Sequence, residues 1–257
     1  MTIPTHPTPQ VSAAAPSERG PSEREFESKL YESYSNWKGW SDHFTCGGLD
    51  RERFREDFAG IDLAGKTLLE IGFGPGALLA WAREMGADVT GSEINAESLA
   101  AASREGIPVV PPDFERTGAL ADGSFDIVVA YDVFEHLDPP TLKAKLVALD
   151  QALRPGGLLV LRYPNGQSPF GLPSQHGDVT HLQALSEMKI TQLADGTGLV
   201  TQSYRGAAFA AHPRLVHRAA VWFRNRLRRV IIRVIQFAIA TDIPLEPVMV
   251  HILRKAR

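Results

Sequence analysis

A glycine-rich turn follows the first apolar run of the chain and limits what the chain can fold into. The run is KTLLEIGF, and the stretch LLEIGFGPGAL places Gly72, Gly74 and Gly76 directly after it. Glycine lets the backbone turn tightly and lets a ligand approach the main chain closely. The next segment, PGALLAWAREMGA, has the pattern of a helix, whose first N–H groups would point at that ligand. The sequence therefore favours a strand–turn–helix unit that binds a ligand.

Strand and helix patterns alternate around this turn. They predict strands at 66–73, 88–93, 108–113, 124–133 and 158–164, and helices at 75–87, 95–106 and 139–157. Two late strands, 199–210 and 247–256, could pair antiparallel at one sheet edge. Such alternation is typical of an α/β fold. We expect an open, mostly parallel, Rossmann-like sheet with an antiparallel edge strand, helices on both faces and a helical insertion before the last strand.

The chain has 257 residues, enough for one large α/β domain. Residues 1–22 are rich in Pro, Ser and Ala and are expected to form a disordered tail. We expect residues 23–257 to form a single domain, with a helical lid at 23–60 and a basic helical insertion at 212–241. The only cysteine, Cys46, excludes an intramolecular disulfide and a Cys-based zinc cluster.

The location expected for the chain is cytoplasmic. The N-terminus lacks the apolar core of a secretory signal. No apolar run reaches the roughly 18 uncharged residues that a membrane span needs.

Acidic residues around the glycine turn predict the kind of ligand. Glu93 closes the second expected strand, about twenty residues past the glycines, where a carboxylate can bind both ribose hydroxyls. Gly72, Gly74 and Ala77 also satisfy a dinucleotide fingerprint, so the ribose alone does not identify the cofactor. Glu70 stands two residues before the first glycine, and an acid there suits a cationic amino group better than a pyrophosphate.

Further motifs follow in order. PPDFE ends the third expected strand with Asp113 and Phe114, an acceptor and an aromatic ring suited to adenine. FDIVVAYDVFEHL is then followed by ALRPGGLLVLRYPN. Together with the glycine turn and Glu93, these motifs resemble those of the class I S-adenosylmethionine-dependent methyltransferases, over roughly residues 66 to 165.

The resemblance implies S-adenosylmethionine as the cofactor and assigns its contacts. The glycine turn would meet the methionine half, and Glu93 would bind the ribose. Asp113 and Phe114 would frame the adenine. Tyr131 and Asp132, at the end of the fourth expected strand, would border the sulfonium and the substrate. His136, in the EHL that opens the following helix, is expected to be structural.

A loop with two histidines follows the fifth expected strand, at the sheet edge where ligands bind in open α/β folds. Its sequence SPFGLPSQHGDVTHLQALS holds His176, Asp178, Thr180 and His181 within six positions. We favour Asp178 orienting His181, with His181 or His176 as the base that takes a proton from the acceptor. A loop whose Asp and Thr only satisfy backbone groups is the main alternative. A metal is not expected, because too few ligands converge.

The same loop has a narrower resemblance. PNGQSPFG…HGDVTHLQALS is similar to a subgroup of these methyltransferases that often accompanies polysaccharide and O-antigen biosynthesis, although His176 stands where the subgroup has an aromatic residue. The resemblance implies O-methylation of a saccharide or another small hydroxyl acceptor. Two alternatives are a non-catalytic S-adenosylmethionine-binding partner in a biosynthetic assembly, and N- or C-methylation of a small metabolite.

Residues 196–241 contain eight arginines and no Asp or Glu. A helix over 214–240 would place Phe223, Leu227, Val230, Val234 and Ala238 on one face, with arginines on both sides. Such a helix is typical of peripheral membrane contact, here at the inner face of the membrane, or of packing against its own domain or a second subunit in a homodimer. Packing is the favoured interpretation. Nucleic acid is not expected, because the segment has no lysine and no aromatic–basic RNA motif.

Overall fold

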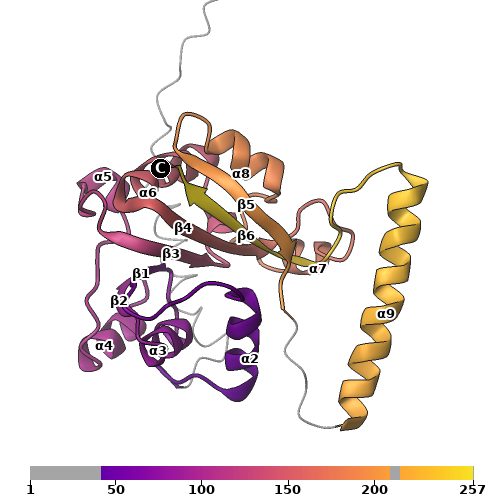
Figure 1. Cartoon of the computed structure of the whole chain (residues 1–257), viewed down its shortest axis with the longest axis horizontal. Coiled ribbons are helices and arrows are strands. Elements are labelled where there is room, and N and C mark those ends of the chain that lie inside the picture. Colours follow the sequence, from indigo (N-terminus) through magenta and orange to yellow (C-terminus); the bar gives the residue numbers. More distant parts are fainter. Residues whose placement is uncertain (1–41, 209–214, 257) are drawn as a thin grey trace, which may run out of the picture.

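The computed structural model describes residues 42–208 and 215–256. Its strands are β1 (Thr67–Ile71), β2 (Asp88–Ser92), β3 (Phe125–Tyr131), β4 (Leu153–Pro164), β5 (Leu199–Gly206) and β6 (Val248–Lys255). They form one six-stranded sheet in the order β2-β1-β3-β4-β6-β5 (Figure 1). The expected tail and the first part of the expected lid lie outside the described residues.

Neighbouring strands from β2 to β4 are parallel, and β6 runs antiparallel to both β4 and β5. The two late strands thus form an antiparallel pair at one edge, as the sequence predicted. Because β6 begins beside the end of β4, with Val248 opposite Pro164, the chain enters β6 at the edge where the parallel strands end. The predicted open, Rossmann-like α/β sheet is confirmed.

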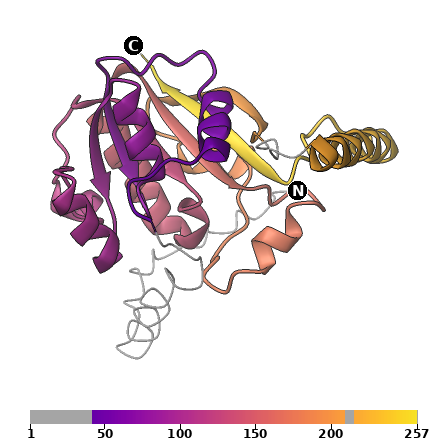
Figure 2. The same cartoon turned by 90° about the horizontal axis from the view of Figure 1, so that it is seen from below.

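Helices cover both faces of the sheet (Figure 2). On one face lie α2 (Gly48–Asp57), α3 (Ala77–Glu84) and α4 (Ala96–Arg104), and on the other α5 (Phe114–Thr117), α6 (Pro139–Ala152) and α8 (Glu187–Leu193). Alternate side chains of β3 serve the two faces: Ile127 and Val129 join one core, and Val128 and Ala130 join the other. A strand buried on both faces needs apolar residues at successive positions, and residues 127–131 of β3, IVVAY, supply them.

One expected strand is wrong. Residues 108–113 form only an isolated bridge between Val109 and Gly91. Pro111 and Pro112 follow at once, and proline has no N–H to donate to a ladder. The chain instead passes from α4 into the short helix α5.

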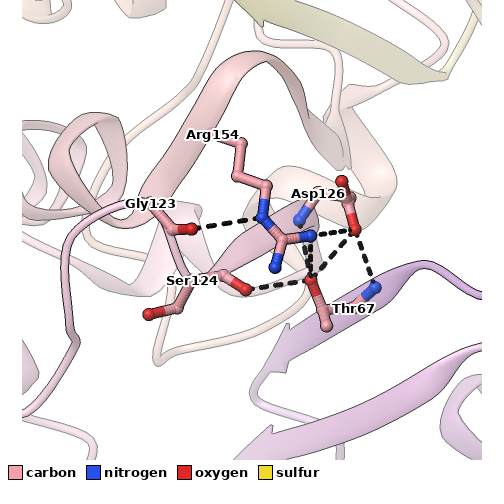
Figure 3. Close-up of polar contacts among 5 residues, drawn as sticks. All are labelled: Thr67, Gly123, Ser124, Asp126 and Arg154. Carbon is pink, nitrogen blue, oxygen red and sulfur yellow. Dashed lines mark hydrogen bonds and ion pairs between the residues drawn. The ribbon is translucent and has the colours of Figure 1, made fainter.

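A polar cluster joins three strands at their amino ends (Figure 3). The carboxylate of Asp126 accepts hydrogen bonds from the backbone N–H of Thr67 at 3.0 Å and from the guanidinium of Arg154 at 2.5 Å. Thr67 begins β1, Asp126 lies at the start of β3 and Arg154 at the start of β4. The cluster therefore ties the sheet together at the edge opposite the carboxyl ends of the parallel strands.

Candidate active site

A cavity of about 560 Å³ lies at the carboxyl ends of β1, β2 and β3. Its wall includes Arg53, Phe54, Glu70, Gly72, Gly74, Glu93, Ile94, Asp113, Tyr131, Asp132, His136 and Arg162. Arg53 and Phe54 come from α2, so the described part of the expected N-terminal lid contributes to the wall. This is the edge at which open α/β sheets bind their ligands.

The glycine turn has the backbone form that the sequence predicted. Gly72, Gly74 and Gly76 have φ values of 65°, 52° and 77°, a region that strains other residues. A Cβ on Gly72 would lie 2.5 Å from Cγ2 of Val133. Gly76 precedes α3, and a Cβ there would strike Phe44. Gly76 is not among the residues that line the cavity, and its positive φ turns the chain into α3; its assignment as a cofactor contact stays a prediction.

Glu93 lies in the cavity wall and holds the surrounding backbone. One carboxylate oxygen accepts from the N–H of Gly74 at 2.7 Å. The other accepts from Ile94 at 2.6 Å and from Asn95 at 2.9 Å. Glu93 therefore joins the glycine turn to the β2–α4 turn, and it presents its carboxylate at the cavity, where the sequence placed a ribose contact.

Glu70 is buried at the end of β1 and also lines the cavity. Its Oε2 atom has no hydrogen-bond partner among the described residues. Burial, and next the nearby charge of Glu93, raise the pKa of Glu70 well above its usual range. A buried acceptor of this kind is satisfied by a cationic donor in the cavity, so the site fits the ammonium group of S-adenosylmethionine.

The two residues expected to frame the adenine lie in different places. Asp113 lies in the cavity wall, but Phe114 does not. Phe114 is 1% exposed in the core, with Lys145 Nζ 4.2 Å from its ring centroid. The assignment of Phe114 fails because the third strand does not form: α5 begins at Phe114 and turns the ring inward. Ile94, 52% exposed beside Glu93, is one of the apolar wall residues that sequence reasoning missed.

Tyr131 and Asp132 lie where β3 ends, both in the cavity wall. The Tyr131 hydroxyl donates to Asp57 at 3.4 Å, and burial raises the pKa of the Asp57 carboxyl. Asp132 has a positive φ of 54° and forms an ion pair with Arg162. The sharp turn at Asp132 brings its carboxylate to the boundary between this cavity and a second one.

The second cavity, of about 300 Å³, shares Asp132, His136 and Arg162 with the first. The rest of its wall comprises Glu135, Pro164, Pro173, Ser174, Gly177, Asp178, His181 and Val248. The two-histidine loop supplies several of these residues, through the short helix α7 (Leu172–His176) and the turn after it. The two-histidine loop and the residues that follow β3 therefore line the same cavity, which adjoins the larger one.

His181 lines this cavity, and one of its ring nitrogens is engaged by the protein. Its Nδ1 lies 3.1 Å from the carbonyl of Gln175, and since a carbonyl only accepts, Nδ1 carries the hydrogen. In the neutral ring the lone pair is then on Nε2. Asp178 Oδ2 lies 3.9 Å from Nε2, too far for a hydrogen bond but close enough to stabilise a protonated ring. The residue that orients His181 is therefore Gln175 rather than Asp178.

Asp178 instead anchors Thr180, which in turn orients His136. Asp178 Oδ1 accepts from the Thr180 hydroxyl at 2.5 Å and from its N–H at 3.0 Å. Burial opposes ionisation, but these hydrogen bonds prevail and lower the pKa of Asp178. His136 Nδ1 lies 2.9 Å from the Thr180 hydroxyl oxygen and 3.2 Å from its carbonyl, so it donates to them. His136 was expected to be structural. Its Nδ1 makes these contacts, and the residue also lines both cavities.

His176 does not share this site. Its side chain is exposed, and it is absent from the wall of either cavity. Of the two candidate bases, only His181 therefore lines the second cavity, and the position of His176 gives its assignment as a base no support. Sequence reasoning missed the site roles of Arg162 and Glu135, because they meet the loop only once the strands are side by side; the EHL motif was the available signal for Glu135 and His136.

Glu135, His136 and His181 offer ligand atoms that all lie within 4.8 Å of one another. Both imidazoles have their Nδ1 engaged by protein oxygens, the arrangement that usually orients a metal-binding histidine. The sequence predicted no metal here, and that stays a prediction.

Comparisons with known proteins agree with this geometry. A family model described as a methyltransferase domain matches residues 69–161. An uncharacterized methyltransferase of Mycobacterium avium is 32% identical over 192 residues, which is 65% of this chain and 72% of that protein. A ubiquinone biosynthesis O-methyltransferase of Psychrobacter arcticus is 32% identical over 139 residues, 49% of this chain and 50% of that protein.

Solved structures share the fold. An S-adenosylmethionine-dependent methyltransferase from Archaeoglobus fulgidus superposes with a TM-score of 0.59 at 18% identity, covering 89% of this chain and 99% of its own. One from Mesorhizobium loti gives 0.58 at 18% identity, covering 81% and 100%. With the glycine turn, Glu70 and Glu93 around a cavity of suitable chemistry, the chain belongs to the class I S-adenosylmethionine-dependent methyltransferases.

Proposed function

We propose that the enzyme methylates a hydroxyl oxygen of a saccharide or another small hydroxyl compound bound in the second cavity. The observation that carries this proposal is the place of His181, which lines a cavity adjoining the larger one and whose Nδ1 donates to Gln175, so that the lone pair of the neutral ring is on Nε2. A hydroxyl must lose a proton as it is methylated, so an oxygen acceptor needs such a base. Relatives named as ubiquinone biosynthesis O-methyltransferases support oxygen as the acceptor atom.

S-adenosylmethionine, when bound, supplies a methyl group with a good leaving group. The protein's share of the work is to position the acceptor and to take its proton. His181 takes that proton at Nε2, with Nδ1–H held by Gln175. The ionised Asp178, 3.9 Å from Nε2, stabilises the imidazolium that results. Asp132 and Arg162, which line both cavities, border the path between donor and acceptor.

The saccharide class rests on the resemblance of the loop PNGQSPFG…HGDVTHLQALS to the polysaccharide-associated subgroup. Incubation with S-adenosylmethionine carrying a ¹³C-labelled methyl group tests it directly. The acceptor panel comprises free sugars, nucleotide sugars, lipid-linked saccharides, catechols and small amines. We expect a new O-methyl resonance with a member of the saccharide set. Labelling of the catechols alone would leave O-methylation and reject the saccharide, and labelling of nitrogen or carbon alone would reject the proposal.

A second way of activating the hydroxyl has its own observation. Glu135, His136 and His181 could together hold a divalent transition-metal ion, which would acidify a hydroxyl bound to it. Metal analysis of the purified enzyme, and turnover after chelation and after re-addition of Mn²⁺ or Zn²⁺, separate the two. The base mechanism predicts that chelation changes turnover by less than about twofold, whereas the metal alternative predicts a loss of about 10²-fold or more that the metal restores.

A further inference from the structure

The helix α9 (Leu215–Ala238) joins β5 to β6 and stands to one side of the sheet in both views (Figures 1 and 2). It carries six arginines and no Asp, Glu or Lys. Its length and its separation from the helices that cover the sheet set it apart from them. No described helix is long and apolar enough to pass through a bilayer, and α9 is no exception.

One face of α9 is an exposed apolar stripe, formed by Phe223, Leu227, Val230, Val234 and Phe237. These residues are spaced by three or four positions, so they lie in one row along the helix. Phe223 is 65% exposed, Val234 61% and Phe237 89%. No described residue covers the stripe, so the expected packing of this face on its own domain is not found in the described part of the chain.

The opposite face of α9 makes the contacts with the rest of the chain. Ile232 is buried, Asn225 and Gln236 are half-buried, and all three lie across the helix from the apolar stripe. Gln236 Nε2 donates to the carbonyl of Ile243 at 2.8 Å. The fold thus rests on the more polar side of the helix and presents its apolar side outward. This is the reverse of an ordinary amphipathic helix of a globular domain.

Arginines border the apolar stripe on both sides. Arg226 and Arg233 lie beside one border, and Arg224 lies beside the other. The guanidinium of Arg226 lies 5.2 Å from the ring centroid of Trp222, so its stem covers apolar surface. A face that is apolar along its centre and cationic along its borders matches the boundary between acyl chains and anionic headgroups.

The segment after α9 is fixed at the rim of the second cavity. Asn165 Nδ2 donates to the carbonyls of Pro244 and Glu246, each at 2.9 Å, and the Ser168 hydroxyl donates to that of Leu245 at 2.6 Å. Val248, the first residue of β6, lines the cavity itself. A surface bound by α9 would therefore be tethered to the rim of the acceptor cavity.

We propose that α9 is an interfacial helix that binds the surface of an anionic lipid bilayer, with its apolar stripe in the acyl boundary and its arginines on the lipid phosphates. A second copy of the chain matches the face less well, because two such stripes meeting face to face would bring their arginine borders together. A nucleic acid would use the arginines and leave the apolar stripe exposed. Lipid satisfies both features at once.

Vesicle flotation of the full-length enzyme tests the proposal. We expect flotation with phosphatidylcholine vesicles containing phosphatidylglycerol, none with phosphatidylcholine alone, and loss of binding as salt is raised. The combined variant Arg226→Gln, Arg229→Gln and Arg233→Gln should weaken binding on the order of 100-fold. The matched control Arg55→Gln, Arg104→Gln and Arg116→Gln changes the total charge equally at exposed sites elsewhere and should bind almost as the wild type.

The apolar stripe is tested separately with Val230→Gln, Val234→Gln and Phe237→Gln. Because these side chains are exposed, we expect lost flotation with an unchanged melting temperature and an unchanged sedimentation coefficient. Absence of flotation with anionic vesicles at low salt would overturn the proposal. A lower melting temperature in the stripe variant would assign the stripe to a contact within the chain, and conversion of a dimer to a monomer would assign it to a second copy. These readouts are independent of methyl transfer, so they stand or fall separately from the proposed function.

Discussion

Glu93 combines two tasks in one buried carboxylate. It accepts three backbone hydrogen bonds from the turns after β1 and β2, and it lines the cofactor cavity. Glu93→Ala should weaken S-adenosylmethionine binding by about 1–3 kcal/mol, because buried donors lose their acceptor. Titration calorimetry measures this change.

The control is Glu97→Ala, which removes the same charge from an exposed position in the first turn of α4. Its affinity should match that of the wild type. Equal affinities for Glu93→Ala and the wild type would remove Glu93 from the cofactor site, and tight binding of NAD with no response to S-adenosylmethionine would contradict the cofactor assignment as a whole.

His251 is a buried histidine on β6, between β4 and β5, and it lines neither cavity. Its ring contacts the hydroxyls of Tyr163 at 3.0 Å and Thr201 at 2.8 Å, and burial lowers its pKa to about 4. Because the folded pKa lies below the usual value of about 6.5, the unfolded chain binds the proton first as pH falls. The neutral ring therefore favours folding fully above about pH 6.5, and stability is lost between there and pH 4.

Between pH 7 and pH 5 this single group should cost the wild type about 2 kcal/mol of unfolding free energy. Urea unfolding of the wild type and of His251→Asn at both pH values isolates the contribution, since the other titrating groups are common to both. The variant should show a fall smaller by about that amount. Parallel falls in the two proteins would mean that His251 does not titrate as its burial implies.

At the scale of the elements, the turn after β1 combines two constraints on Gly72. Its φ is positive, and a Cβ would lie 2.5 Å from Val133. Gly118 also has a positive φ, but nothing lies within 4 Å of its would-be Cβ. Gly72→Ala should therefore cost at least about 1 kcal/mol more stability than Gly118→Ala, and it alone should lower cofactor affinity. Thermal unfolding and calorimetry of both variants measure this, and equal effects would refute the close-approach argument.

The elements differ in how far the sequence determines them. Buried strands such as β3 can be predicted from the sequence because both of their faces pack against apolar residues. The start of α8 can be predicted because Ser186 caps it, with the Ser186 hydroxyl oxygen accepting a hydrogen bond from the N–H of Lys189. The prediction of a third strand at 108–113 was wrong because it relied on two valines and ignored the two prolines that follow them. Phe114 then moved with it, since its direction depends on the backbone that carries it.

The candidate site divides in the same way. Glu70, Gly72 and Glu93 follow directly from local motifs after strands, and the structure places all three in one cavity wall. His136 and Arg162 line the second cavity only because β3 and β4 end side by side, beneath a loop that returns to them. Which side of such a loop faces the cavity depends on long-range packing, so the choice between His176 and His181 needed the structure.

In the whole molecule, the two cavities and the polar cluster that joins the strands lie at opposite edges of the sheet. The two cavities lie at the carboxyl edge, and the cluster of Asp126, Thr67 and Arg154 holds the amino edge (Figure 3). Burial raises the pKa of Asp126, but hydrogen bonds from Thr67 and Arg154 prevail and lower it. The ionised carboxyl therefore stabilises the fold above its unfolded pKa of about 3.9, and this contribution is lost as pH falls through its lower folded value.

Asp126→Asn should reduce the free energy of unfolding by about 1–2 kcal/mol at pH 7 without changing the affinity for S-adenosylmethionine. The control Asp88→Asn alters the same charge at the start of the neighbouring strand β2, where the side chain is exposed, and should change neither. The difference in the free energy of unfolding between Asp126→Asn and the wild type should become smaller at acidic pH. A variant that bound cofactor more weakly while remaining as stable as the wild type would contradict this division of the sheet.

The central claim is that the acceptor loses its proton to His181 in the second cavity, and the pH dependence of turnover tests it most directly. Turnover is measured at saturating S-adenosylmethionine for the wild type, His181→Asn and the matched variant His176→Asn, whose side chain is exposed and outside both cavities. We expect His181→Asn to lower turnover by about 10²–10⁴-fold, to lose the acidic limb of the profile and to keep its cofactor affinity, whereas His176→Asn should retain wild-type behaviour. Retention of full turnover and of the acidic limb by His181→Asn would contradict it.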